Sequence, residues 1–373
     1  MVNEERLIGL FKQLCLINAP ALEERACVLW TKNHLEMMGL EVVEDDAGKE
    51  IGGNAGNLIA TLRGTKAGAP RIFLSAHFDT VEPTEGLVME ERDGVIYSAS
   101  DTILGADDKG GMAPIIECCQ HFLETGEEHG DIVLLLSVAE EIGLLGAGAL
   151  KIEDLNLDFG YVFDTGPPVG SFVNRTATHD KMDVTIYGVP AHAGKHPEEG
   201  ISAIQVAADA ISNMKLGRIG PETTANIGLI MGGTAVNVVP PFTKLKCEAR
   251  STSVPELDAQ IAHMKGEFEA AAARWGADVS IEHKRHYSSY EVDPSSKVIE
   301  IAQRAAANLG FDGALRTTLG GSDANQYNAK GVPTIVVATG MEKIHTHDEY
   351  ISRKELIQTA ELAIEIVREA AKR

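Results

Sequence analysis

The sequence predicts an α/β protein: a mainly parallel sheet sandwiched by helices, with a smaller ferredoxin-like α+β domain inserted into it. Short apolar runs alternate with amphipathic helical stretches towards both ends of the chain, which is the pattern of parallel strands joined by helices. Between residues 176 and 287 the order of elements changes. The chain has 373 residues, too many for one ordinary hydrophobic core, so two domains are expected.

The outer domain is expected at residues 1–175 and 288–373. Residues 4–38 have the pattern of two helices, interrupted at Asn18-Ala19-Pro20. Strands are expected at residues 40–43, 57–62, 71–76, 131–136, 159–163 and 332–338, with a helix after Gly105 and another over the last twenty residues. Several of these strands run directly into a histidine or a carboxylate.

The inserted domain is expected at residues 176–287. Its elements are a strand at 181–187, a helix at 201–214, strands at 225–231 and 243–250, a helix at 255–275 and a strand at 277–284. This βαββαβ order is that of a ferredoxin-like unit. Insertion is compatible with the outer domain because the ends of a domain usually lie close together.

Composition and charge narrow the function classes. The hydrophobic fraction is 44%, as in soluble globular proteins, and no stretch approaches the ~20 apolar residues that cross a bilayer. Lys and Arg number 33 against 55 Asp and Glu, a net charge of -22, which argues against nucleic acid and anionic membranes as partners. The five cysteines show no C-x-x-C spacing and the N-terminus lacks a secretory segment, so we expect a cytoplasmic protein with reduced thiols.

Two adjacent carboxylates, Glu140 and Glu141, follow the apolar strand at residues 131–136. Neighbouring side chains on an extended chain point to opposite sides, so one could bind a cation while the other moves a proton. A second interpretation is a solvated pair that opens a helix, where negative charge suits the helix dipole.

Further polar residues stand at the ends of other apolar runs. Together with the glutamate pair the set is His77, Asp79, Asp107, Glu140, Glu141, Asp164 and His345. Ligands of an open parallel sheet bind outside the carboxyl ends of its strands. Each residue has an ordinary structural explanation, such as a core histidine, a helix N-cap or a turn aspartate. Such separate explanations do not account for the position of all seven residues at one edge of the sheet.

Histidine and carboxylate donors without cysteine suit zinc, or cobalt or manganese in its place. The donors are too many for one tetrahedral ion, whereas two ions ~3.5–4 Å apart that share a carboxylate would use them all. Asp79 lies close enough in sequence to accept the second N–H of His77 and so to fix its tautomer.

Four ordered motifs resemble those of the di-zinc peptidase superfamily, which includes peptidase T, glutamate carboxypeptidases, aminoacylases and succinyl-diaminopimelate desuccinylase. The motifs are His77-Phe78-Asp79-Thr80-Val81, Gly105-Ala106-Asp107-Asp108-Lys109-Gly110-Gly111, Ala139-Glu140-Glu141-Ile142-Gly143 and the late His345. The chain is most similar to the peptidase T-like branch, over essentially its whole length.

The resemblance implies a role for each residue of this set. Asp107 would bridge two metal ions, His77 and Asp164 would complete one ion, and Glu141 and His345 the other. Glu140 would be the general base that takes a proton from a metal-bridging water and passes it to the leaving amine.

The resemblance also extends to the inserted domain. His192 resembles a histidine that reaches the active site of a partner subunit and steadies the oxyanion, which implies a homodimer formed through residues 176–287. Asn237 and Arg250 resemble residues that hold the carboxylate end of the substrate, and Gly320 and Gly321 a loop that lines the pocket. Without the resemblance, His192 could be an ordinary turn histidine and Arg250 an ordinary surface arginine.

We therefore expect a zinc metallopeptidase that cleaves an amide bond in a small substrate, most simply an aminopeptidase or tripeptidase. The alternatives are an N-acyl-amino-acid deacylase of the same superfamily and, in a different class, a non-catalytic peptide-binding scaffold. Leu319 stands where tripeptidases of the family carry an arginine, and Thr165-Gly166-Pro167-Pro168 also departs from their pattern. These departures concern the substrate and leave the metal residues untouched.

Overall fold

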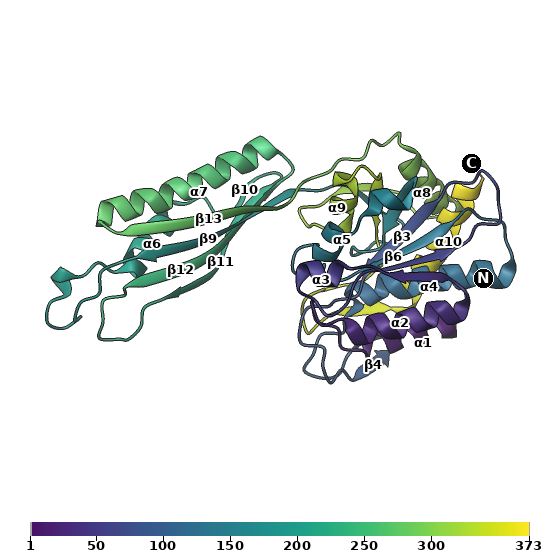
Figure 1. Ribbon diagram of the computed structural model, residues 1–373, viewed down its shortest axis with the longest axis horizontal. Helices are drawn as coiled ribbons and strands as arrows, with labels where there is room; N and C mark the ends of the chain where they lie inside the picture. Colours follow the sequence, from purple (N-terminus) through teal and green to yellow (C-terminus); the bar gives the residue numbers. More distant parts are fainter. Residues whose placement is uncertain (1, 373) are drawn as a thin grey trace. The chain divides into compact units, whose positions relative to one another are not determined.

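The computed structural model describes residues 2–372, which form two compact units (Figure 1). Unit 1 comprises the chain up to Arg175, residues 290–317 and the chain from Ser322 onwards. Unit 2 comprises residues 176–289 together with the short segment 318–321.

Unit 1 is built on an eight-stranded sheet in the order β1-β2-β6-β3-β7-β15-β8-β14. The four central strands β6, β3, β7 and β15 are parallel. Strands β1 and β2 join their neighbours in antiparallel fashion, and β8 is antiparallel to β15 but parallel to β14. In sheet order the strands are Glu41–Glu44, Leu58–Leu62, Ile132–Ser137, Ile72–His77, Phe159–Val162, Thr334–Val337, Phe172–Arg175 and Leu315–Thr317. The predicted α/β class with a mainly parallel sheet is confirmed.

Helices flank this sheet because its central strands are apolar on both faces. Every residue of β3, β6, β7 and β15 is buried. Helix α4 packs on β3 and against α1 and α10, and α9 packs on β7 and β15. The helices of unit 1 are α1 Glu4–Cys15, α2 Arg25–Met38, α3 Ala47–Ile51, α4 Ala106–Thr125, α5 Leu145–Ala149, α8 Lys297–Asn308, α9 Asp323–Ala329 and α10 Arg353–Ala371.

Unit 1 also contains a small three-stranded sheet that the sequence did not indicate. It consists of β4 (Met89–Arg92), β5 (Val95–Ser98) and β16 (Tyr350–Ser352), in the order β16-β5-β4. These strands have three or four residues each, too few for an alternating pattern to stand out. Among residues 2–372, no helix has both the length and the apolar character required to cross a bilayer.

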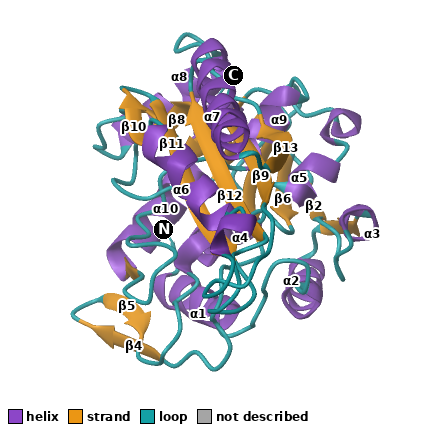
Figure 2. Ribbon diagram, turned by 90° about the vertical axis from the view of Figure 1, so that its left-hand side faces the viewer, coloured by secondary structure: helices purple, strands orange, loops and turns teal. Residues whose placement is uncertain are grey.

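Unit 2 is an antiparallel sheet in the order β10-β11-β12-β9-β13, with α6 (Ala203–Asn213) and α7 (Val254–Trp275) packed on it (Figure 2). Its strands are β9 Thr178–Tyr187, β10 Gly217–Gly220, β11 Thr223–Gly232, β12 Phe242–Ser251 and β13 Asp278–Tyr287. Without the short β10, the chain order is the predicted βαββαβ and the spatial order is that of a ferredoxin-like unit. Alternate residues of β9 and β12, such as Val184 and Leu245, form its hydrophobic core.

Candidate metal centre

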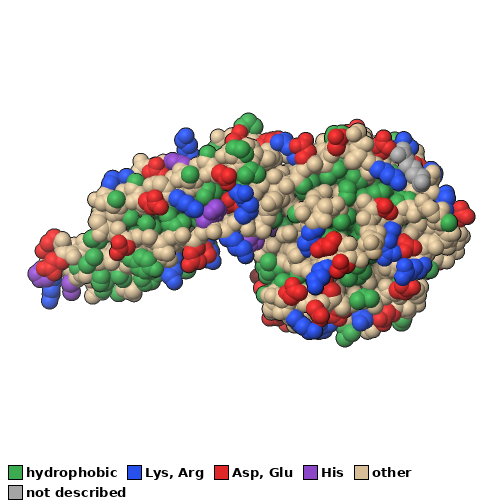
Figure 3. Space-filling model, turned by 45° about the horizontal axis from the view of Figure 1, so that its top comes forward, with side chains coloured by type: hydrophobic (Ala, Val, Ile, Leu, Met, Phe, Trp, Pro, Cys, Tyr) green, Lys and Arg blue, Asp and Glu red, His purple; other side chains and the backbone are tan. Residues whose placement is uncertain are grey.

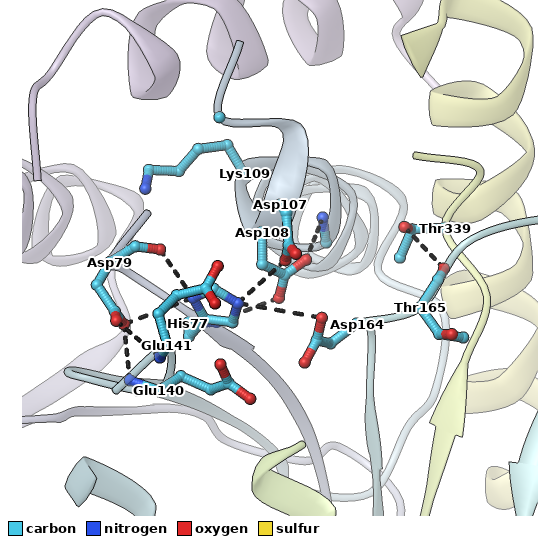
Figure 4. A network of polar contacts seen from close by, with 12 residues as sticks. His77, Asp79, Asp107, Asp108, Lys109, Glu140, Glu141, Asp164, Thr165 and Thr339 are labelled. Atoms are coloured by element: carbon cyan, nitrogen blue, oxygen red, sulfur yellow. Dashed lines mark hydrogen bonds and ion pairs between the residues drawn. The ribbon is translucent and has the colours of Figure 1, made fainter. Parts of the chain in front are cut away.

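The parallel strands of unit 1 deliver most of the polar set to one sheet edge. Strand β3 lies between β6 and β7 and ends at His77. Strand β6 is followed by Glu140 and Glu141, and β7 by Asp164. Because the three strands are parallel, their carboxyl ends meet. Figure 4 shows His77 and Asp164 pointing towards one another.

Asp107 stands between two imidazoles. Its Oδ1 lies 3.1 Å from His77 Nε2, and its Oδ2 lies 3.1 Å from His345 Nε2. His345 Nε2 also lies 3.0 Å from Glu141 Oε1, and His77 Nε2 lies 4.0 Å from Asp164 Oδ1. Each oxygen of one carboxylate therefore faces a different histidine.

These distances define two groups of three donors that share one carboxylate. Ligand-type atoms of His77, Asp107 and Asp164 lie within 4.8 Å of one another, as do those of Asp107, Glu141 and His345. The groups are those assigned to the two metal ions from the sequence. A third group of the same kind contains His77, Glu140 and Glu141, so Glu140 reaches the same space.

The alternative structural explanations for Glu140, Glu141 and Asp107 do not fit. The glutamates do not open a helix, because α5 begins only at Leu145 and Glu140 is buried. Asp107 is not an N-cap, because Gly105 holds that position with a φ of 76°. Asp107 itself has non-helical backbone angles, and so its side chain leaves the helix direction.

The crowded carboxylates of the cluster favour the binding of a cation. Burial, with neighbouring carboxylates adding to it, raises the pKa of Asp164 well above that of an ordinary aspartate. Burial likewise raises the pKa of Glu140. The hydrogen bonds with Asp107 and Glu141 raise the pKa of His345 to about 10, so these carboxylates draw a positive charge towards themselves. Imidazole and carboxylate donors in this number fit divalent zinc, cobalt or manganese.

Lys109, a buried cation of the same segment, does not neutralise these donors. Its Nζ donates a hydrogen bond to the backbone carbonyl of Phe78. Figure 4 shows its side chain extending away from Asp107 and Asp164. The negative charge of the donors is therefore left for a bound ion.

Asp79 supports the site through the backbone. The Nδ1–H of His77 donates to the carbonyl oxygen of Asp79 at 2.8 Å, while Asp79 Oδ1 is 3.5 Å away. This leaves the Nε2 lone pair of His77 directed at Asp107 and Asp164. The Asp79 carboxylate instead accepts the backbone N–H groups of Glu140 and Glu141, at 2.9 and 3.0 Å. The orienting role expected for its side chain is thus carried mainly by its main chain.

Three supporting carboxylates were not singled out from the sequence. Asp108 Oδ2 accepts the backbone N–H of His77, and Glu24 Oε1 accepts that of Ala139. Glu349 accepts those of Gly105 and Asp107. Asp108 and Glu349 lie inside or beside the quoted motifs, which could have pointed to them, whereas nothing in the sequence around Glu24 points to this role.

In unit 2, Arg250 and the glycine loop come together. Arg250 Nη1 lies 3.3 Å from the carbonyl oxygen of Leu319, and Nη2 lies 3.0 Å from Glu248 Oε2. The hydrogen bond from His179, together with the nearby Arg250 guanidinium, lowers the pKa of Glu248 to about 2. Gly321 must be glycine at this point, since an added Cβ would lie 2.2 Å from the Tyr287 ring.

His192 and Asn237 lie at the other end of the unit 2 sheet. His192 lies on the loop that follows Tyr187, whereas Asn237 lies on the loop between β11 and β12, and a hydrogen bond from Ala193 N–H to Asn237 O joins the two loops. Arg250 pairs with His179 across the sheet, and Phe242 pairs with Tyr187. Eight residues of β9 separate the two ends, about 27 Å at the usual strand rise. Within one chain, Asn237 and Arg250 therefore cannot grip the same carboxylate.

Residues 73–369 match the sequence pattern of peptidase family M20/M25/M40. The chain belongs to that family. Aminopeptidase PepT of Bacillus cereus ATCC 10987 is 40% identical, with a TM-score of 0.89 over 99% of both chains. A tripeptidase of Staphylococcus aureus subsp. aureus Mu50 is 38% identical, with a TM-score of 0.95 over the whole of both chains. Protein YqjE of Bacillus subtilis (strain 168) is 41% identical over the full length of both chains.

The expected family and enzyme class are thereby confirmed. The chain is a metallopeptidase of the peptidase T-like branch of the M20 family. A peptide hydrolase of this family needs a metal centre, and the cluster around Asp107 has the donors for one.

Removing divalent ions should destabilise unit 1, because it leaves the buried carboxylates of the cluster facing one another. Saturating zinc at about 100 times its Kd should add about 2.7 kcal/mol to the free energy of unfolding. Thermal unfolding of chelator-treated protein with and without added zinc measures this. Asp107→Ala, which takes one donor from both groups, should show a much smaller shift. Equal midpoints for the wild-type protein with and without zinc would contradict a metal centre here.

Proposed function

We propose that this M20 peptidase hydrolyses an amide bond of a short peptide with two divalent cations that share Asp107. Zinc is the expected metal, and cobalt or manganese could replace it. The observation that carries the proposal is the position of Asp107, whose two oxygens face two different imidazoles. The bound cations would polarise the substrate carbonyl and lower the pKa of the attacking water.

Glu140 is the proposed general base. Its backbone is fixed by the Asp79 carboxylate, and its side chain is nearly buried, 9% exposed. Within residues 2–372 its own carboxylate is engaged in no hydrogen bond or ion pair, in contrast to that of Asp79. A Glu140 oxygen can therefore take a proton from the attacking water and deliver it to the nitrogen of the leaving amine.

Arg250 is the proposed anchor for the carboxylate end of the peptide. Its Nε is buried and has no hydrogen-bond partner among the described residues. The planar guanidinium can grip a carboxylate through two parallel hydrogen bonds. Leu319 adds no second positive charge beside it, so Arg250 would carry this contact with the adjacent glycines, Gly320 and Gly321. The similar proteins named aminopeptidase and tripeptidase support a short peptide as substrate.

We also propose a homodimer in which each active site receives His192 from the partner. An extended tripeptide spans about 10 Å, far less than the strand length of about 27 Å that separates Arg250 from the His192 loop in one chain. If both residues contact one substrate, they must come from different subunits. Asn237, on a neighbouring loop that is hydrogen-bonded to the His192 loop, would then also act on the partner's substrate.

The edge of unit 2 formed by β11 is the proposed dimer contact. Within residues 2–372, no strand pairs with the outer side of β11 beyond Ala225, and Leu229, Ile230 and Met231 are more than half exposed. Figure 3 shows hydrophobic side chains gathered at the lower left, on unit 2. The opposite edge, β13, carries charged residues such as Glu282 and Lys284, which discourage pairing. A two-fold contact along β11 would cover both apolar edges.

The cysteines support a cytoplasmic location. All five are free and buried, including the adjacent pair Cys118 and Cys119. Free thiols of this kind are usual in a reducing compartment.

Replacing the general base should abolish turnover while the metal ions stay bound. Glu140→Gln keeps the size of the side chain but cannot accept the proton, so kcat should fall by about 10²–10⁴-fold. Peptide hydrolysis and metal content are measured on the same preparation. Glu85→Gln, an exposed glutamate, is the matched control and should be unchanged. A Glu140→Gln enzyme with near wild-type kcat would exclude Glu140 as the base.

Mixing two inactive variants should restore activity if His192 acts across the dimer. His192→Ala and Glu140→Gln should each be nearly inactive, because an oxyanion donor contributes about 2.7–4 kcal/mol to catalysis. In a mixed dimer, one of the two sites combines an intact Glu140 with the partner subunit's His192. Up to about half of the wild-type activity per mixed dimer is expected. No recovery after demonstrated subunit exchange, or a fully active monomer, would contradict the proposal.

A further inference from the structure

The carboxylate of Glu349 links two of the metal-binding segments. Glu349 is fully buried, in the loop between His345 and β16. Its Oε2 accepts the backbone N–H of Gly105 at 2.7 Å, and its Oε1 accepts that of Asp107 at 3.0 Å. The backbone N–H of Glu349 donates in turn to the carbonyl oxygen of Thr346 at 3.1 Å. One side chain thus joins the loop of His345 to the loop of Asp107.

The two N–H groups belong to a backbone that the helix itself does not hold. Gly105 has a φ of 76°, and Asp107 has φ -82° and ψ 104°, so the regular helical pattern begins only after them. Hydrogen bonds from backbone N–H groups to an ionised carboxylate are among the stronger ones in proteins. Glu349 therefore fixes the segment from which the Asp107 side chain reaches the two imidazoles.

Glu349 does not belong to the donor set itself. Both of its oxygens face backbone N–H groups, and none of the donor groups found among residues 2–372 includes it. Its relation to Asp107 resembles that of Asp79 to the Glu140–Glu141 turn, where a buried carboxylate also accepts two N–H groups. Asp79 lies 61 residues from Glu140, whereas Glu349 lies 242 residues from Asp107.

We propose that Glu349 is a positioning residue that sets the affinity for both metal ions together. The proposal rests on the two-ion function proposed above. Because Asp107 belongs to both donor groups, a shift of its backbone moves one oxygen away from His77 and the other away from His345. Loss of the Glu349 carboxylate should therefore weaken the binding of both metal ions, and not only the binding of the ion nearer to it.

Glu349→Gln tests this with little change of shape, because one of the two acceptor oxygens becomes an amide that cannot accept an N–H. Asp348→Asn, next to it and exposed, is the matched control. Cobalt is titrated into metal-free protein in competition with a chelator, with the visible spectrum of the bound cobalt followed. We expect both equivalents of the Gln variant to bind about 10–100-fold more weakly, with an altered cobalt spectrum. The Asn control should match the wild type.

The KM, a second variant and the number of ions bound by the wild type provide further tests. At saturating metal the KM of Glu349→Gln should stay near that of the wild type, because Glu349 does not touch the peptide. Unchanged affinities and spectrum, or weakening of one ion only, would overturn the proposal. If the Gln variant fails to fold, Glu349→Asp is used instead, because it keeps the charge but shortens the side chain by one methylene. This variant must also bind both metal ions more weakly. A wild-type protein that binds fewer than two ions would instead refute the two-ion function.

Discussion

Mutual repulsion among buried carboxylates is the constraint on which the rest of unit 1 depends. The carboxylates crowded at the carboxyl ends of β3, β6 and β7 and at the start of α4 are Asp79, Asp107, Asp108, Glu140, Glu141 and Asp164. Two imidazoles face them, and the buried Lys109 extends elsewhere. Charges packed at this density are costly in a protein interior unless hydrogen bonds or cations compensate them. The fold supplies the hydrogen bonds, and divalent ions are the compensation that remains.

The carboxylates are divided between two tasks. Some accept backbone N–H groups and fix the loops, as Asp79 does for Glu140 and Glu141 and as Glu349 does for Asp107. Asp107, Asp164 and Glu141 instead present oxygens to the imidazoles, where an ion can bind. Among the described residues, hydrogen bonds hold only the backbone of Glu140, which leaves its carboxylate available for the proposed exchange of protons. Rigid loops with a small number of free oxygens are what a metal-dependent hydrolase requires.

The sequence predicted the metal-binding edge because its strands are short, apolar and parallel, and each runs directly into a histidine or a carboxylate. It could not show that Glu349 holds Asp107, because that contact joins segments 242 residues apart. The small sheet of β4, β5 and β16 was missed because its strands are so short. Asn237 and Arg250 were both expected at the carboxylate end of the substrate, and the sequence could not show that they lie at opposite ends of the unit 2 sheet within one chain. A motif identifies residue types, whereas only strand pairing reveals how far apart they lie.

The shared position of Asp107 between two ions is the central claim. Anomalous X-ray diffraction at the zinc edge, from crystals of zinc-loaded protein, tests it most directly. Two peaks about 3.5–4 Å apart are predicted, with one oxygen of Asp107 on each. One peak should adjoin His77 and Asp164, and the other Glu141 and His345. A single peak at full zinc occupancy, or two peaks with Asp107 bound to only one of them, would contradict the claim.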